Sequence, residues 1–163
     1  MTAKPGSEEA TSLGHMPGDR WAFDSVVTTV FSDMLRRSIP EYDGMRDAVF
    51  SLGSKFVRPD THIVDLGCSR GDALAPFVAR FGARNNYAGV EVSKPMLAAA
   101  RERFADHIEQ GLVSIDDLDL RSDYPKVEAS LTLCILSLQF IPIDHRQRIL
   151  HETYTNTCKE VPS

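Results

Sequence analysis

Apolar residues recur at helical spacing in two segments near the start of the chain. Between residues 23 and 37 they fall three or four positions apart, and the same spacing returns over residues 45–56. Pro40 separates the two patterns. Pro59 follows the second and disfavours the helical conformation at Arg58. The pattern therefore predicts two helices, over 23–37 and 45–56, ahead of the main fold.

After Pro59, short apolar runs alternate with segments of helical spacing. The runs predict strands at 62–66, 87–92, 112–115 and 129–137, and the helical spacing predicts helices at 72–81, 94–105 and 144–157. This alternation is typical of an α/β fold with a Rossmann-like parallel sheet. Right-handed crossovers give the strand order 3-2-1-4, with a ligand site beyond the carboxyl end of the first strand.

The composition divides the 163 residues into three parts. Residues 1–20 are rich in Gly, Pro, Ser and charge and are expected to be a disordered leader. Residues 21–58 form a helical cap, and 59–163 form a Rossmann-like ligand-binding domain. A net charge of −5 and the lack of a basic patch argue against non-specific nucleic-acid binding.

No membrane or secretion signal is evident. No apolar run approaches the ~18 residues that span a bilayer, and the N-terminus lacks the apolar core of a secretory signal. The three cysteines, Cys68, Cys134 and Cys158, are odd in number and far apart. This spacing fits no metal site and indicates reduced thiols in the cytoplasm.

The strongest chemical signal is the segment DLGCSRG, from Asp65 to Gly71, between the first strand and the next helix. Its glycines allow a tight turn and a close ligand. Glu91, at the end of the second strand, can accept hydrogen bonds from ribose hydroxyls. Together they indicate an adenosyl ligand. The spacing from Gly67 to Gly71 is not that of the dinucleotide motif G-x-G-x-x-G, so a nicotinamide-dependent reductase is a less favoured alternative.

Three aspartates, Asp116, Asp117 and Asp119, follow the third strand. Two interpretations stay open for them. One is an adenine contact, for which Asp119 and Leu120 fit best; the other is a solvated charged loop. A hard-metal site is discounted because the spacing is not that of a calcium-binding loop.

The turn at Asp65 resembles motif I of the class I S-adenosylmethionine-dependent methyltransferases, an acidic residue followed by a glycine-rich turn. The chain from Phe23 to about Leu150 further resembles one subfamily. This subfamily contains the carboxy-S-adenosylmethionine synthases of tRNA wobble-uridine modification and their methyltransferase relatives. The segments that carry the resemblance are Phe23-Asp24, Val30-Phe31-Ser32-Asp33-Met34, Arg37-Ser38-Ile39-Pro40, Tyr42, Asp65-Leu66-Gly67-Cys68-Ser69 and Ser137-Leu138-Gln139-Phe140.

The resemblance implies S-adenosyl-L-methionine as cofactor. Tyr42 is expected to close over it from the N-terminal helices, the turn to hold its methionine end, Glu91 to bind ribose, and Asp119 with Leu120 to bind adenine. Val92 stands where the family often has a polar residue, and Ile135 where the synthases have asparagine. The implied cofactor-binding residues are Tyr42, Asp65, Gly67, Cys68, Ser69, Gly71, Glu91, Val92, Asp119, Leu120 and Ile135.

The expected activity is methyl transfer to a small-molecule or tRNA-related acceptor, with no residue singled out as catalytic. Synthase-like chemistry and a non-catalytic cofactor-binding or partner-binding module are the alternatives. Arg36 and Arg37 are weaker candidates for a substrate carboxylate or phosphate.

The family continues into further strands, so we expect a truncated version of the fold. Its fourth strand would then be an apolar edge that needs a second copy or a second chain to cover it. The apolar residues of this edge are Leu131, Leu133, Ile135, Leu136 and Leu138.

Overall fold

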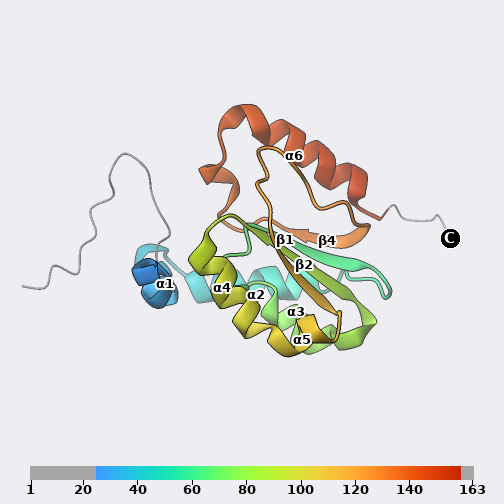
Figure 1. Cartoon of the computed structure of the whole chain (residues 1–163), viewed down its shortest axis with the longest axis horizontal. Coiled ribbons are helices and arrows are strands. Elements are labelled where there is room, and N and C mark those ends of the chain that lie inside the picture. Colours follow the sequence, from blue (N-terminus) through green and yellow to red (C-terminus); the bar gives the residue numbers. More distant parts are fainter. Residues whose placement is uncertain (1–24, 159–163) are drawn as a thin grey trace, which may run out of the picture.

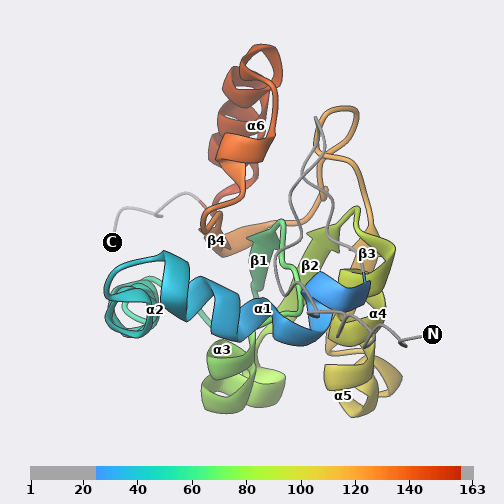
Figure 2. The ribbon, with the colours of Figure 1, turned by 90° about the vertical axis from the view of Figure 1, so that its left-hand side faces the viewer.

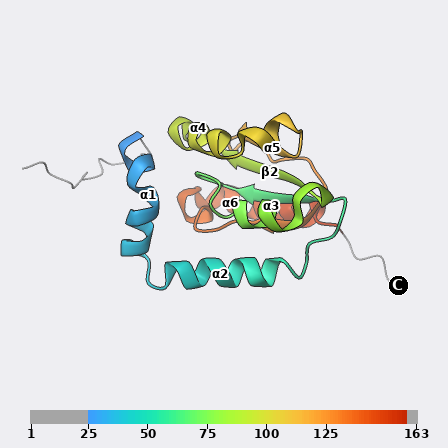
Figure 3. The ribbon, with the colours of Figure 1, turned by 90° about the horizontal axis from the view of Figure 1, so that it is seen from below.

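The computed structural model describes residues 25–158 (Figure 1), so the leader expected at residues 1–20 lies outside the described residues. Two helices open this part of the chain, α1 (Ser25–Ser38) and α2 (Tyr42–Gly53). Glu41, with φ 53°, turns the chain between them, and the two helices run in different directions (Figure 3). Helix α2 begins and ends about three residues earlier than the apolar spacing predicts.

The sheet confirms the predicted topology. Its four strands are β1 (His62–Leu66), β2 (Asn86–Glu91), β3 (Val113–Asp117) and β4 (Ala129–Leu133), all parallel and in the order β3-β2-β1-β4. In this register Asp65 lies opposite Gly89 of β2 and Leu133 of β4. The carboxyl ends of β1 and β2 therefore meet at one edge of the sheet.

Helices cover both faces of the sheet. Helices α3 (Ala75–Phe81), α4 (Lys94–Arg103) and α5 (Ala105–Glu109) lie on one side, and α6 (Ile143–Asn156) lies on the other (Figures 1 and 2). Because side chains alternate along a strand, Ile63 packs toward the first side with Phe77, while Val64 packs toward the second with Ile149. Asp65 therefore shares the face that looks toward α2, α3 and α4.

Two connecting segments differ from the prediction. Helix α3 begins at Ala75 rather than at residue 72, because the turn that follows β1 continues through Leu74. Strand β4 ends at Leu133 rather than at residue 137. The chain there bends at Leu136, which has φ 55°, and enters a short 3₁₀ helix, η2 (Leu138–Phe140). This bend carries Ser137 back over the end of β1, where its Oγ donates to Leu66 O at 2.6 Å.

The end of the described chain returns to the edge of the sheet. Thr157 forms a parallel bridge with Ala129, and Cys158 N–H donates to Ala129 O at 2.9 Å. Of the apolar residues expected to be exposed along this edge, Leu133 is buried, and Leu131 and Ile135 pack against the core. Among residues 25–158, no helix has the length and apolar character needed to cross a bilayer.

Candidate ligand site

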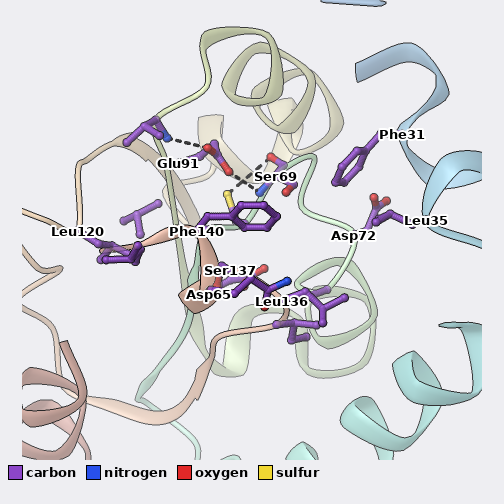
Figure 4. Close-up of a pocket in the computed structure, with 18 of the residues that line it drawn as sticks. Phe31, Leu35, Asp65, Ser69, Asp72, Glu91, Leu120, Leu136, Ser137 and Phe140 are labelled. Carbon is purple, nitrogen blue, oxygen red and sulfur yellow. Dashed lines mark hydrogen bonds between the residues drawn. The ribbon is translucent and has the colours of Figure 1, made fainter. Parts of the chain in front are cut away.

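A cavity of about 720 Å³ opens at the carboxyl ends of β1 and β2 (Figure 4). Helices α1 and α2 and the segments that follow β1, β2, β3 and β4 all contribute to its wall. Ten of the eleven residues predicted to bind a cofactor line it. These ten are Tyr42, Asp65, Gly67, Cys68, Ser69, Glu91, Val92, Asp119, Leu120 and Ile135.

Gly71 is the one predicted residue that does not line the cavity. It has φ +76°, and a Cβ added there would lie 2.4 Å from Cε2 of Phe104. Glycine at this position therefore lets the turn pack against Phe104. It also adopts the positive φ, which side chains disfavour.

The turn after β1 has an unusual backbone. Gly67 has φ +76°, and Ser69 has φ +49° although it carries a side chain. A Cβ at Gly67 would lie 2.6 Å from Cβ of Ser137, so glycine allows the segment after β4 to approach. The N–H groups of Gly67 and Cys68 both donate to Val90 O at 3.0 Å. These bonds fix the turn to the neighbouring strand.

Asp65 is the most unusual polar group of the site. It is 2% exposed, and its Oδ2 accepts no hydrogen bond from any described residue. Burial raises the pKa of this carboxyl to about 7, while the positive charge of Arg46 opposes the rise and Glu91 adds to it. Leaving a buried carboxylate oxygen unpaired costs free energy. Its position in a cavity wall therefore points to a cationic or hydrogen-bond-donating ligand.

Glu91 connects two turns. Its Oε2 accepts from Ser69 N–H at 3.0 Å (Figure 4). Its Oε1 accepts from Val92 N–H at 2.8 Å and from Ser93 N–H at 3.0 Å. A carboxylate has about four acceptor positions, so capacity is left for a ligand hydroxyl. The side chain of Val92 is 54% exposed at the cavity wall. Glu91 therefore has a structural role, and its ligand contact stays a prediction.

At the far end of the cavity, Arg121 holds Asp119. The guanidinium donates to both carboxylate oxygens at 2.6–2.9 Å, and Arg121 N–H donates at 2.9 Å. These bonds lower the pKa of Asp119. Of the three aspartates predicted to follow the third strand, Asp116 and Asp117 are the last two residues of β3, and only Asp119 lines the cavity. Asp117 pairs with Lys94. Residues 25–158 contain no group of three or more potential ligands that could hold a metal ion.

The side chain of Cys68 belongs to the core although the residue lines the cavity. Its Sγ lies 2.9 Å from the position that a Cβ on Gly89 would take, so glycine on β2 makes room for it. Burial raises the pKa of this thiol, which keeps it protonated at neutral pH. Cys68 is therefore a packing residue rather than a nucleophile.

Sequence reasoning missed most of the helical wall. Phe31, Leu35 and Ile39 of α1 and the following segment line the cavity, and Phe140 joins them from η2. Figure 4 shows Phe31 and Leu35 on one side and Leu120 on the other. The apolar spacing over residues 23–37 predicts only a helix. Nothing in that spacing distinguishes a cavity wall from a core face.

The arginines chosen from the sequence do not reach the site. Arg36 Nε pairs with Asp43 at 3.1 Å, and Arg37 Nε pairs with Asp33 at 3.0 Å. Neither arginine lines the cavity. Arg46, one turn into α2, does line it and was not predicted.

The parallel sheet and the cavity at its carboxyl edge define a Rossmann-like α/β ligand-binding domain. A family model described as "Methyltransferase domain" matches residues 63–159. The chain therefore belongs to the methyltransferase-domain family.

Relatives and solved structures agree with this assignment. The chain is 36% identical over 133 residues to the carboxy-S-adenosyl-L-methionine synthase of Methylococcus capsulatus, covering 81% of this chain and 55% of the relative. It is 33% identical over 155 residues to the synthase of Shewanella amazonensis, covering 94% and 60%. The chain thus spans little more than half the length of these relatives.

The fold matches an S-adenosylmethionine-dependent methyltransferase from Clostridium acetobutylicum with a TM-score of 0.63 and 17% identity, covering 82% of this chain and 53% of that one. A second structure, from Geobacter sulfurreducens, was solved in complex with S-adenosyl-L-homocysteine. It matches with a TM-score of 0.55 and 15% identity, covering 77% and 49%.

Proposed function

We propose that this chain binds S-adenosyl-L-methionine and forms the cofactor-binding part of a methyltransferase. The observation that carries the proposal is the buried, unpaired Oδ2 of Asp65 in the wall of the cavity. The ammonium group of an amino acid would satisfy that oxygen with a charge-assisted hydrogen bond. Membership of the methyltransferase-domain family supports the same ligand.

The residues present fit the other parts of this cofactor. Three backbone N–H groups already donate to Glu91, so about one acceptor position is left for a ribose hydroxyl. Leu120 offers an apolar surface for adenine, and Arg121 keeps the neighbouring Asp119 in one orientation. The cofactor supplies an activated methyl group when bound.

The chain's own contribution to the reaction is positioning. The turn from Gly67 to Ser69 is fixed by bonds to β2, so it meets a ligand without further ordering. The apolar side chains of Phe31, Leu35 and Phe140 reduce the access of water to the cavity. No described residue of the cavity is assigned as a general base, which leaves the nucleophile to the acceptor, a small molecule or a tRNA-related substrate.

A second candidate is carboxy-S-adenosylmethionine synthase-like activity. It is favoured by one observation, the 33–36% identity to relatives of that name. The same cofactor site serves both candidates. They separate in the product, because a methyltransferase releases S-adenosyl-L-homocysteine whereas a synthase releases a carboxylated cofactor.

The proposal is tested by calorimetric titration of the full chain with S-adenosyl-L-homocysteine, 5′-methylthioadenosine and NADH. We expect binding of the first two and none of NADH. Asp65→Asn should weaken S-adenosyl-L-homocysteine at least about 10-fold, because a charge-assisted bond is lost. Asp116→Asn, outside the cavity, is the matched control. A wild-type chain that binds neither adenosyl compound would contradict the proposal.

Bound ligand without turnover would identify a non-catalytic binding module. Mass spectrometry of the small molecules that co-purify with the protein identifies its ligand. A second native sample is then incubated with S-adenosyl-L-methionine and either a candidate methyl acceptor or a carboxyl donor, which separates these cases. Recovery of S-adenosyl-L-homocysteine after incubation supports methyl transfer, and recovery of a carboxylated derivative supports the synthase.

We also propose that β4 is covered by a second copy of this chain or by another polypeptide, in the cytoplasm. Beyond the bridge at Ala129, the outer edge of β4 has no strand partner among the described residues. Leu150 and Tyr154 of α6, the helix that follows β4 and η2, are 58% and 71% exposed. The cysteines Cys68, Cys134 and Cys158 are all free, which fits a reducing compartment. A monodisperse monomer in light scattering would contradict a homodimer.

A further inference from the structure

Arg46 is a cation of the cavity without an anionic partner. It is half-buried, lines the main cavity, and also lines a smaller adjoining cavity of about 200 Å³. Its guanidinium carbon lies 6.0 Å from the centre of the Tyr42 ring. It forms no ion pair with any residue in the described range 25–158, whereas Arg36, Arg103 and Arg121 each hold a carboxylate.

The neighbouring carboxylates do not neutralise it. Asp72 lines both cavities with Arg46, but its Oδ1 pairs with Arg103 Nη1 at 2.6 Å. Asp47 lines only the smaller cavity and is exposed. Arg46 therefore keeps a free planar donor group, the type that binds carboxylates with two parallel hydrogen bonds.

Asp65 and Arg46 can carry opposite charges and line the same cavity, but they do not pair with each other. Asp65 lies on the face of β1 that looks toward α2, and Arg46 is the charged neighbour that most strongly opposes the rise of its pKa. The two groups are thus close enough to interact. They nevertheless form no salt bridge, and Oδ2 of Asp65 has no hydrogen-bond partner in the part of the chain that the structure describes. A ligand that carries both charges on adjacent groups would satisfy both residues.

We propose that Arg46 binds the α-carboxylate of the cofactor's amino-acid portion while Asp65 binds its ammonium group. Arg46 is then a specificity-determining residue, which selects adenosyl compounds with an intact amino acid over decarboxylated ones. This inference rests on the proposed function. Asp65 alone would bind an amine as well as an amino acid, and Arg46 alone would bind a simple acid as well. Together they favour a ligand that carries both groups.

The test compares three ligands by calorimetry on the full chain. They are S-adenosyl-L-homocysteine, its decarboxylated analogue, which keeps the ammonium, and 5′-methylthioadenosine, which lacks both charged groups. Wild-type protein should prefer the first over the second by about 10- to 100-fold, the range expected for a hydrogen-bonded charge. Arg46→Gln should remove most of this preference by weakening S-adenosyl-L-homocysteine alone. Asp65→Asn should weaken both ligands that carry an ammonium group.

Two variants complete the test. Arg46→Lys keeps the charge but not the two parallel donors, so it should retain an intermediate preference. Arg36→Gln removes an exposed arginine that is paired with Asp43, outside the cavity, and should leave all three affinities unchanged. The proposal is overturned if Arg46→Gln weakens all three ligands equally, or if it changes none. Binding of no adenosyl compound by wild-type protein would instead contradict the proposed function itself.

Discussion

The cavity has two walls of different construction. The sheet wall consists of polar groups that backbone hydrogen bonds hold in place: Gly67 and Cys68 bond to β2, and Ser69 bonds to Glu91. The helical wall consists mainly of apolar side chains from α1, which packs on α4 through Phe31 and Met96. In the proposed function, the polar groups of the sheet wall and Arg46 of α2 select the ligand. The apolar side chains of α1 shield the ligand from water.

The largest predicted effect breaks the sheet wall at Asp65. The pKa of Asp65 is about 7 in the folded chain and near 3.8 when unfolded. Ionisation of Asp65 therefore lowers the free energy of unfolding increasingly as the pH rises from about 4 to about 7. Asp65→Asn removes this loss of stability. Without ligand, we expect the variant to be more stable than wild type by up to about 4 kcal/mol at pH 8 and by about 2 kcal/mol at pH 5. Urea unfolding at both pH values measures this.

Saturating S-adenosyl-L-homocysteine should narrow this difference at pH 8 by about 1.4 kcal/mol for each 10-fold difference in affinity, because the wild type alone pairs the carboxylate with the ligand. An Asp65→Asn chain that is less stable than wild type without ligand at pH 8 would show that the carboxylate stabilises the fold. Asp65 would then be a structural residue and not a ligand-binding group of the sheet wall.

The next effect concerns the turn itself. Gly67→Ala adds a Cβ 2.6 Å from Ser137 Cβ at a residue with φ +76°, so both the turn and the segment after β4 must shift. We expect a loss of about 2–4 kcal/mol in the free energy of unfolding, with loss of ligand binding. Gly82→Ala is the matched control. It also has positive φ but meets no atom within 4 Å, so it should cost about 1 kcal/mol.

A smaller effect is expected at Glu91. Glu91→Gln replaces one carboxylate oxygen by an NH₂ group, which cannot accept from Ser69 or from Val92 and Ser93. The free energy of unfolding should fall by about 1–2 kcal/mol, and S-adenosyl-L-homocysteine should bind about 10-fold more weakly. Calorimetry and urea unfolding on the same sample measure both. Unchanged affinity would remove Glu91 from the ligand contacts.

The smallest effect separates the two walls. Leu35→Ala shortens a half-buried side chain of the helical wall that packs against the small cluster of Phe31 and Met96. Affinity should fall about 3- to 10-fold while the free energy of unfolding changes by less than about 1 kcal/mol. A loss of stability as large as that of Gly67→Ala would show that α1 belongs to the core of the fold.

The sequence predicted the sheet wall far better than the helical wall. The alternation of strands and helices, with right-handed crossovers, predicts the strand order, and the strand order predicts where a ligand site lies. Asp65 and Glu91 lie in the cavity at that position. The early end of β4 was missed because the residues after Leu133 are as apolar as a strand. The left-handed bend at Leu136 carries no glycine to signal it.

Arg46 illustrates what sequence alone leaves undetermined. On α2 it is one charge among several, and Arg36 and Arg37 are equally plausible from spacing. Only the packing of α2 beside α3 shows that Arg46 lines the cavity while Arg36 pairs with Asp43. Which arginine faces the cavity depends on the angle between the helices, and the apolar spacing of the sequence does not predict that angle.

A crystal structure of the full chain with S-adenosyl-L-homocysteine tests the central claim most directly. The account predicts that the ligand's amino group lies within hydrogen-bonding distance of Asp65 Oδ2 and that its ribose hydroxyls reach Glu91. An adenosyl ligand bound with its amino acid elsewhere, and Asp65 Oδ2 still without a partner, would contradict it.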